Sequence, residues 1–137
     1  MRLFVDTSSL FKKYADEPGS EAFEKLLSKT AEIVVSPVTW LEMNATIERC
    51  VREDTLTREK AEWLRVEVKK DFAYFLLTVW NENLEHEAVQ LIRQHALKTL
   101  DAVQLASGIL SGSEIFVTSD RRLHRVAKNV IPHVRLV

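Results

Sequence analysis

Short apolar runs alternate with longer amphipathic stretches along this chain. Five of the runs have the length and the content of Val, Ile, Leu and Phe that are typical of buried β-strands. The clearest is the first, where Leu3, Phe4 and Val5 follow one another directly. On this pattern, the predicted strands cover approximately residues 2–5, 32–36, 76–80, 114–120 and 133–137.

The stretches between these strands carry apolar side chains at helical spacing. Helices are predicted over approximately residues 9–15, 20–29, 37–53, 56–75, 82–97, 97–112 and 121–129. The hydroxyl side chains of residues 7–9 are predicted to cap the first helix, and Ser20 the second. Strands separated by helices predict an α/β fold, with a parallel sheet covered on both faces. Two successive helices are expected between the second and third strands.

The composition is that of one globular domain over residues 1–137, with 46% hydrophobic and 28% charged residues. The net charge of -1 argues against a strongly basic nucleic-acid binder, although local basic patches remain compatible with it. The single cysteine, Cys50, excludes a disulfide within the chain and suits a reducing cytoplasm. We expect no signal peptide and no membrane span, because no apolar run reaches about 20 residues.

Four carboxylates lie in apolar surroundings close to predicted strand ends or helix starts. Asp6 and Asp120 each follow a strand and precede a helix. Glu42 lies in the first turn of the helix after the second strand, and Asp101 lies close to another helix start. Each acid taken alone could be a helix cap or a favourable partner of a helix dipole. Together they predict a cluster, because ligands of open α/β sheets bind at the carboxyl ends of the strands.

Such a cluster needs positive charge or protonation, since like charges about 4 Å apart repel by roughly 4 kcal/mol at an effective dielectric near 20. Oxygen ligands favour Mg²⁺ or Mn²⁺, and the sequence has no Cys or His pair at the spacing of a zinc site. Divalent ions among carboxylates can activate a water molecule and neutralise a phosphate. The predicted substrates are therefore phosphate esters, with nucleic acid as the leading case.

The segments "LFVDTSSLFKKY", "VTWLEMNATI", "LKTLDAVQLASGI" and "FVTSDRRLHRVAK" resemble those of PIN-domain ribonucleases, most of all the VapC-type toxins of prokaryotic toxin–antitoxin pairs. The resemblance implies a three-layer α/β/α sandwich with a central, mostly parallel sheet. It also implies Mg²⁺- or Mn²⁺-dependent RNA cleavage, a homodimer and a cognate antitoxin. The catalytic metal ligands that it implies are Asp6, Glu42, Asp101 and Asp120. The hydroxyls that it places beside these acids are those of Thr7, Ser8 and Thr118.

Two residues depart from the commonest pattern of that family. Lys98 and Gln104 stand where many relatives carry Arg and His, although neither position is an acid ligand. The basic residues expected to contact RNA are Arg121, Arg122, Lys98 and Lys12, which lie near the acids in sequence. No histidine is positioned as a general base, so a water molecule activated by the metal is the expected nucleophile.

Other interpretations remain open at the level of sequence. The alternative function is a catalytically silent PIN-fold module that binds RNA or protein, although all four acids are present. A receiver-type signalling domain would need an Asp after the third strand, where this chain has Asn81. Core packing is the expected role of most large aromatic residues, with a partner groove as the alternative for Tyr14, Trp40, Trp63 and Phe72.

Overall fold

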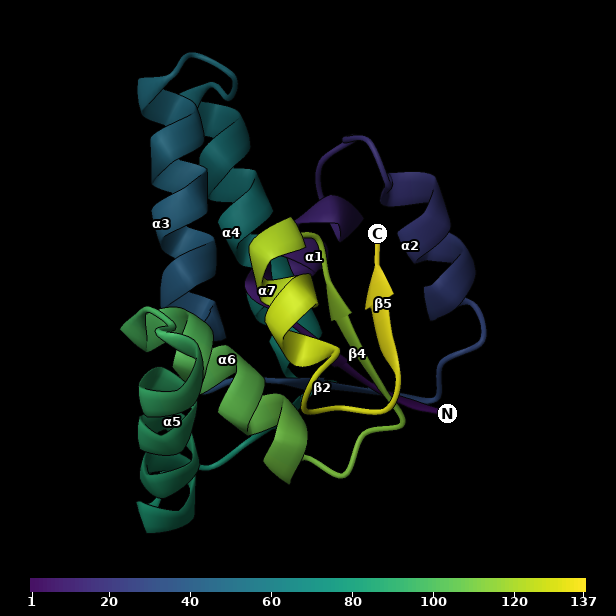
Figure 1. Cartoon of the computed structure of the whole chain (residues 1–137). Helices are drawn as coiled ribbons and strands as arrows, with labels where there is room; N and C mark the ends of the chain where they lie inside the picture. Colours follow the sequence, from purple (N-terminus) through teal and green to yellow (C-terminus); the bar gives the residue numbers. More distant parts are fainter.

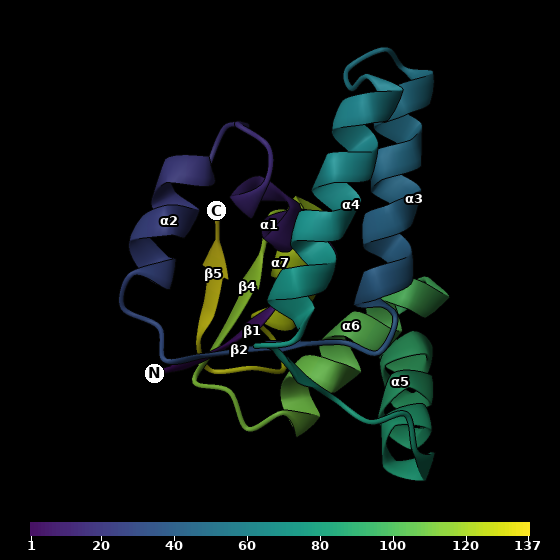
Figure 2. The same cartoon turned by 180° about the vertical axis from the view of Figure 1, so that it is seen from behind.

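The computed structural model describes residues 1–137 and contains one five-stranded sheet (Figure 1, Figure 2). The strand order is β3-β2-β1-β4-β5, and every neighbouring pair is parallel. The chain leaves β1 toward β2 and β3 on one side and returns to β4 and β5 on the other. The strands are β1 (Arg2–Val5), β2 (Glu32–Val35), β3 (Leu76–Leu77), β4 (Ile115–Thr118) and β5 (Val134–Leu136).

Helices cover both faces of this sheet, which confirms the predicted three-layer α/β/α sandwich. The first group comprises α1 (Thr7–Leu10), the 3₁₀ helix η1 (Phe11–Lys13), α2 (Ser20–Leu27), α3 (Thr39–Arg52) and α4 (Arg58–Phe72). The second comprises α5 (Glu82–His95), α6 (Thr99–Leu110) and α7 (Arg121–Ala127). The pair α3–α4 confirms the two successive helices expected between β2 and β3, and it projects past the carboxyl ends of the strands (Figure 1, Figure 2).

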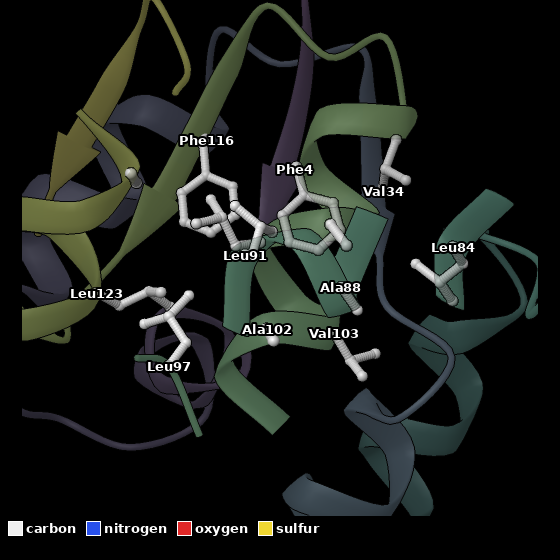
Figure 3. Close-up of a cluster of buried hydrophobic side chains, with 13 residues drawn as sticks. Phe4, Val34, Leu84, Ala88, Leu91, Leu97, Ala102, Val103, Phe116 and Leu123 are labelled. Atoms are coloured by element: carbon white, nitrogen blue, oxygen red, sulfur yellow. The ribbon is translucent and has the colours of Figure 1, made fainter. Parts of the chain in front are cut away.

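Alternation along the strands creates two separate hydrophobic cores. Leu3 and Val5 of β1 face the core under α1–α4, whereas Phe4 between them faces the core under α5–α7. The second of these cores is drawn in Figure 3, where Phe4 and Phe116 lie next to each other. Their rings stack with centroids 5.2 Å apart and an interplanar angle of 9°. Because both cores hold β1 and β4 in place, the residues that directly follow these strands have fixed positions at the edge of the sheet.

Gly108 of α6 is required by this aromatic pair. A Cβ atom at this position would lie 2.4 Å from Cδ2 and 2.7 Å from Cε2 of Phe116. Only a residue without a side chain allows α6 to approach the sheet this closely. This close approach helps to set where the start of α6 lies at the carboxyl edge of the sheet.

The predicted starts of the first two helices were wrong in detail. The first helix begins at Thr7 rather than residue 9, because Asp6 itself is the N-cap and its side chain accepts from the Ser9 amide. The second is preceded by Gly19 with φ 97°, and Ser20 is its first residue rather than its cap. The Ser20 hydroxyl instead closes the preceding turn, where it donates to the carbonyl of Ala15 and accepts from the amide of Glu17.

The third strand is shorter than the predicted range of residues 76–80. Only Leu76 and Leu77 pair with β2, and both side chains are exposed at the edge of the sheet. The helix predicted over residues 56–75 begins and ends inside that range, as Arg58–Phe72. Trp63 on this helix is 60% exposed, so it departs from the expected core packing, whereas Trp40 and Phe72 contact each other edge to face.

No helix of the structure combines the length and the apolar character that crossing a lipid bilayer requires.

Candidate active site

The four carboxylates predicted to converge all line one cleft at the carboxyl edge of the sheet. The cleft has a volume of about 640 Å³ and is lined mainly by polar side chains. The four acids reach it from four different segments of the chain, which meet because α1 contacts α3 and β4 while α6 contacts α7. None of the four forms a salt bridge, although nine such ion pairs occur elsewhere in the molecule.

Asp6 lies at the centre of this edge, directly after β1. Its Oδ1 accepts from the Ser8 hydroxyl at 2.8 Å and from the Ser9 amide at 3.1 Å. Its Oδ2 accepts from the Thr118 hydroxyl at 2.6 Å. Thr118 ends β4, so this bond crosses from β1 to β4 at the point where the strand order reverses. That reversal is where ligands of open α/β sheets bind.

Asp120 caps helix α7 and is tied to Asp6 through Thr118. Its Oδ1 accepts from the amides of Arg122 and Leu123 at 2.8 and 3.0 Å. Its own amide donates to the Thr118 hydroxyl at 3.0 Å. The Thr118 hydroxyl thus donates to one acid while it accepts from the backbone of the other, which fixes their relative positions.

Glu42 is held by a buried polar network that joins three helices. Its Oε1 accepts from the Thr7 hydroxyl at 3.0 Å and from Nε2 of Gln104 at 2.5 Å. The same Nε2 lies 3.0 Å from the Thr7 hydroxyl and 3.4 Å from that of Thr39. Gln104 is only 3% exposed. The sequence drew attention to Gln104 only as a departure from the family pattern and gave no sign that it contacts Glu42.

Burial raises the pKa of Asp6 to about 6. Hydrogen bonds from Thr118, Ser8 and the Ser9 amide oppose this change, and the negative charge of Asp120 adds to it. The energetic cost of the charged form is therefore mainly desolvation.

Burial also raises the pKa of Asp101, and the negative charge of Asp120 raises it further. The positive charges of Arg122 and Lys98 act in the opposite direction. Two of the predicted RNA-binding residues thus lie close enough to the acids to influence them. Burial is thus the main cause of the raised pKa of both acids, and the charge of Asp120 adds to it in each case.

The donor set fits a hard divalent cation that keeps part of its hydration. No three His, Cys, Asp or Glu side chains lie close enough together to hold one ion at the same time. Mg²⁺ needs no such cage, because proteins usually bind it through one or two carboxylates and several waters. Both oxygens of Asp101 and Oδ2 of Asp120 accept no hydrogen bond from the protein.

The other predicted RNA-binding residues occupy different positions. Lys12 lines the cleft, but its Nζ donates to the Pro18 carbonyl at 2.7 Å and lies 3.6 Å from Glu17. Arg121 lines an adjoining smaller depression with Lys12 instead of the acid cleft. Of the four predicted RNA-binding residues, only Lys12 therefore lines the acid cleft itself.

The cleft also holds two cationic residues that were not predicted from the sequence. Arg49 and Arg52 of α3 line the same cleft as the acids, and both are exposed. A signal was present, because residues 42, 49 and 52 fall along one side of an ideal helix.

The structure is thus an α/β fold with a five-stranded parallel sheet in the order 3-2-1-4-5 and, at its carboxyl edge, four carboxylates that form no salt bridge. A family model described as "PIN domain" matches residues 3–129. The chain belongs to the PIN domain family.

Relatives of known name support this assignment. The chain is 27% identical over 128 residues to ribonuclease VapC49 of Mycobacterium tuberculosis strain H37Rv, covering 89% of this chain and 86% of the relative. Ribonuclease VapC45 of strain CDC 1551 matches with the same identity and the same coverage.

Solved structures show the same fold. A toxin–antitoxin complex from Klebsiella pneumoniae matches with a TM-score of 0.70 at 18% identity, over 98% of this chain and 96% of that chain. The toxin VapC20 of M. tuberculosis, described as cleaving the sarcin–ricin loop, matches with a TM-score of 0.68 at 15% identity, over 88% and 92%. At these identities the likeness establishes the fold.

Proposed function

We propose that the protein is an endoribonuclease that depends on Mg²⁺ or Mn²⁺ and serves as the toxin of a type II toxin–antitoxin pair. One observation carries the proposal: four carboxylates from separate segments line one cleft, and none of them is paired with a cation of the protein. The ribonuclease relatives support the choice of RNA among phosphate esters.

Hydrogen bonds hold three of the four acids in place. Asp6 and Asp120 are fixed to each other through Thr118, and Glu42 is oriented by Thr7 and Gln104. Asp6, Glu42, Asp101 and Asp120 are the proposed metal ligands, and each ion would be held by one or two of these carboxylates and by water, because no three of them lie close enough to share one ion. A bound divalent ion would activate water and neutralise charge on the phosphodiester.

The hydroxyls of Thr7, Ser8 and Thr118 hold these ligands in place. Ser8 donates to Asp6 and accepts from the Ser119 amide at 3.0 Å, so it links α1 to the loop after β4. The positive charges of Lys98 and Arg122 lower the pKa of Asp101, and we propose that these two side chains approach the RNA backbone. Phosphate contacts of this kind supply affinity that does not depend on the base sequence.

The solved relatives include toxin–antitoxin complexes, some of them bound to DNA, which supports an antitoxin as the partner of this chain. We further propose a homodimer, a single nuclease domain over residues 1–137 and a cytoplasmic location. Exposed apolar side chains on α4 and the segment after it, including Trp63, Val66, Tyr74, Val79 and Trp80, offer area for such contacts. Co-expression with the protein encoded beside this chain should yield a stable complex, and recovery of free toxin alone would count against the antitoxin.

The catalytic proposal is tested with purified protein and labelled structured RNAs in Mg²⁺ or Mn²⁺. EDTA, Asp6→Asn and Asp101→Asn should each abolish cleavage, while Asp16→Asn, an exposed acid outside the cleft, should not. Cleavage that survives both cleft substitutions would reject the site. A folded protein that neither cleaves RNA nor binds Mn²⁺ in calorimetry would instead be a silent binding module.

A further inference from the structure

One stripe of helix α3 runs along the cleft from its acidic end to its outer end. Glu42, Ala45, Thr46, Arg49 and Arg52 all line the cleft. These five positions fall on one side of the helix, because each of them lies three or four residues from at least one of the others. The stripe changes from an acid near the sheet to two arginines near the tip of the projecting α3–α4 pair (Figure 1).

These two arginines differ from the other arginines of the α3–α4 pair. Arg58 donates to both carboxylate oxygens of Glu48 at 2.8 and 2.9 Å. Arg65 donates to Glu48 and Glu62, each at 2.6 Å, and to Asn44 at the same distance. The bonds to Glu48 and Asn44 join α3 to α4, and neither of these α3 residues lines the cleft.

Arg49 and Arg52 form no side-chain hydrogen bond and no salt bridge. The packing of α3 on α4 therefore does not explain them. Their guanidinium groups remain available on the wall of a cleft whose inner end is acidic. Arginine suits a phosphate because its planar fork can donate two parallel hydrogen bonds.

We propose that Arg49 and Arg52 form a phosphate-binding subsite that holds the RNA strand on one side of the bond to be cleaved, an inference that rests on the proposed ribonuclease function. The acids of the cleft repel the phosphates of an approaching RNA strand. Cationic side chains that contact the same strand offset this repulsion. The axial rise from Glu42 is about 10 Å to Arg49 and about 15 Å to Arg52. At about 3.4 Å per nucleotide of a stacked strand, these rises correspond to phosphates about three to four nucleotides away.

The first test measures binding without cleavage. Fluorescence anisotropy with a labelled, mixed-sequence single-stranded RNA of about 12 nucleotides would be recorded in EDTA, between about 50 and 200 mM salt. In wild type, the logarithm of the RNA association constant should fall as the logarithm of the salt concentration rises. The double variant Arg49→Ala/Arg52→Ala should make this negative slope shallower by about 1.4, because each lost phosphate contact removes about 0.7 for single strands. The matched control is Arg93→Ala, which removes an exposed arginine of α5 that lies outside the cleft.

Lysine variants separate charge from structure. Arg49→Lys/Arg52→Lys should retain most of the slope, because a lysine still neutralises a phosphate as a point charge. A slope that is equal in wild type and the alanine variant, or an equal loss in Arg93→Ala, would overturn the subsite. Absence of RNA binding by the wild-type protein would overturn it as well.

The cleavage assay keeps this inference separate from the proposed function. If binding depends on the two arginines but the wild-type protein never cleaves RNA in Mg²⁺ or Mn²⁺, the subsite stands and the catalytic proposal fails. If cleavage occurs and the alanine variant cleaves with an unchanged KM for RNA, the ribonuclease stands and the subsite fails.

Discussion

Nε2 of Gln104 lies 2.5 Å from Oε1 of Glu42, across 62 residues of sequence and between two different helices. Nε2 of Gln104 donates, whereas Oε1 of Gln104 is buried without a hydrogen-bond partner. The contacts of Nε2 therefore set the orientation of the Gln104 side chain. A carboxylate is the strongest of those acceptors, since hydrogen bonds to a charged group are about twice as strong as neutral ones. Gln104 therefore positions Glu42 within the cleft.

Gln104→Leu should reduce ribonuclease activity and Mn²⁺ affinity by about 10- to 100-fold, the usual effect of losing a partner that orients a metal ligand. Thermal stability should change little, because the substitution also removes a buried unpaired oxygen. The variant would be compared with Glu42→Gln and with the double variant. If Gln104 acts through Glu42, the double variant should be no worse than Glu42→Gln alone. Additive losses would contradict this role.

Asp6→Asn should stabilise the metal-free fold at high pH. The pKa of Asp6 is raised from 3.8 to about 6 in the folded protein, so between these pH values the folded state binds more protons than the unfolded state. The contribution of this group to stability is complete below pH 3.8 and is lost as the pH rises through about 6. The loss amounts to at most about 3 kcal/mol.

Chemical denaturation in EDTA would measure this effect. The free energy of unfolding of Asp6→Asn should exceed that of wild type at pH 8, and the two should agree near pH 4. Asp16→Asn, which changes an exposed acid, serves as the control and should show no such dependence. A destabilised Asp6→Asn at pH 8 would mean that the hydrogen bonds to Asp6 outweigh its desolvation.

Metal affinity should fall as the pH drops below about 6, because Asp6 must lose its proton before it can serve as a ligand. Calorimetry of Mn²⁺ binding in buffers of different ionisation enthalpy should detect a released proton near pH 6 and much less at pH 8. Removal of the metal by EDTA at pH 7 should lower the melting temperature. A pH-independent affinity between pH 5 and 8 would argue that Asp6 is not a ligand.

Thr118→Val should move this pH dependence upward. The hydrogen bond from Thr118 lowers the pKa of Asp6, so its loss should raise that pKa further. The pH midpoint of Mn²⁺ binding should shift to a higher value than in wild type. Thr46→Val, which removes another hydroxyl of the cleft that bonds to none of the four acids, provides the comparison. An unchanged midpoint in Thr118→Val would show that Thr118 has no influence on Asp6 in solution.

Gly108→Ala should destabilise the fold by about 1–3 kcal/mol, as expected for overpacking of a tight core. The added methyl group would meet the ring of Phe116 and push α6 away from the sheet. Because α6 carries Asp101 and Gln104, activity should fall together with the melting temperature. Leu110→Ala, at an exposed position of the same helix, should leave both nearly unchanged. A Gly108→Ala protein as stable as wild type would show that α6 can shift without cost.

The sequence by itself determined the fold class, and it predicted the four acids that line one cleft in the structure. Consecutive apolar residues at 3–5 and 115–117 predict strands of a parallel sheet that is covered on both faces, and this places Asp6 and Asp120 at its carboxyl edge. The apolar surroundings of Glu42 and Asp101 indicated that they are not ordinary surface charges. Local patterns were less reliable at helix starts, where Asp6 and Gly19 compete with nearby serines as N-caps.

Only the tertiary structure decided which polar groups contact the acids. The pairing of Gln104 with Glu42 and of Thr118 with Asp6 depends on how α6 packs beside α3 and how β4 pairs with β1, over separations of 62 and 112 residues. The same packing ties Lys12 to the Pro18 carbonyl and leaves Arg49 and Arg52 on the open wall of the cleft. Periodicity reports which face of an element is buried, but hydrogen bonds between elements are fixed only once the cores on both sides of the sheet have set their distances.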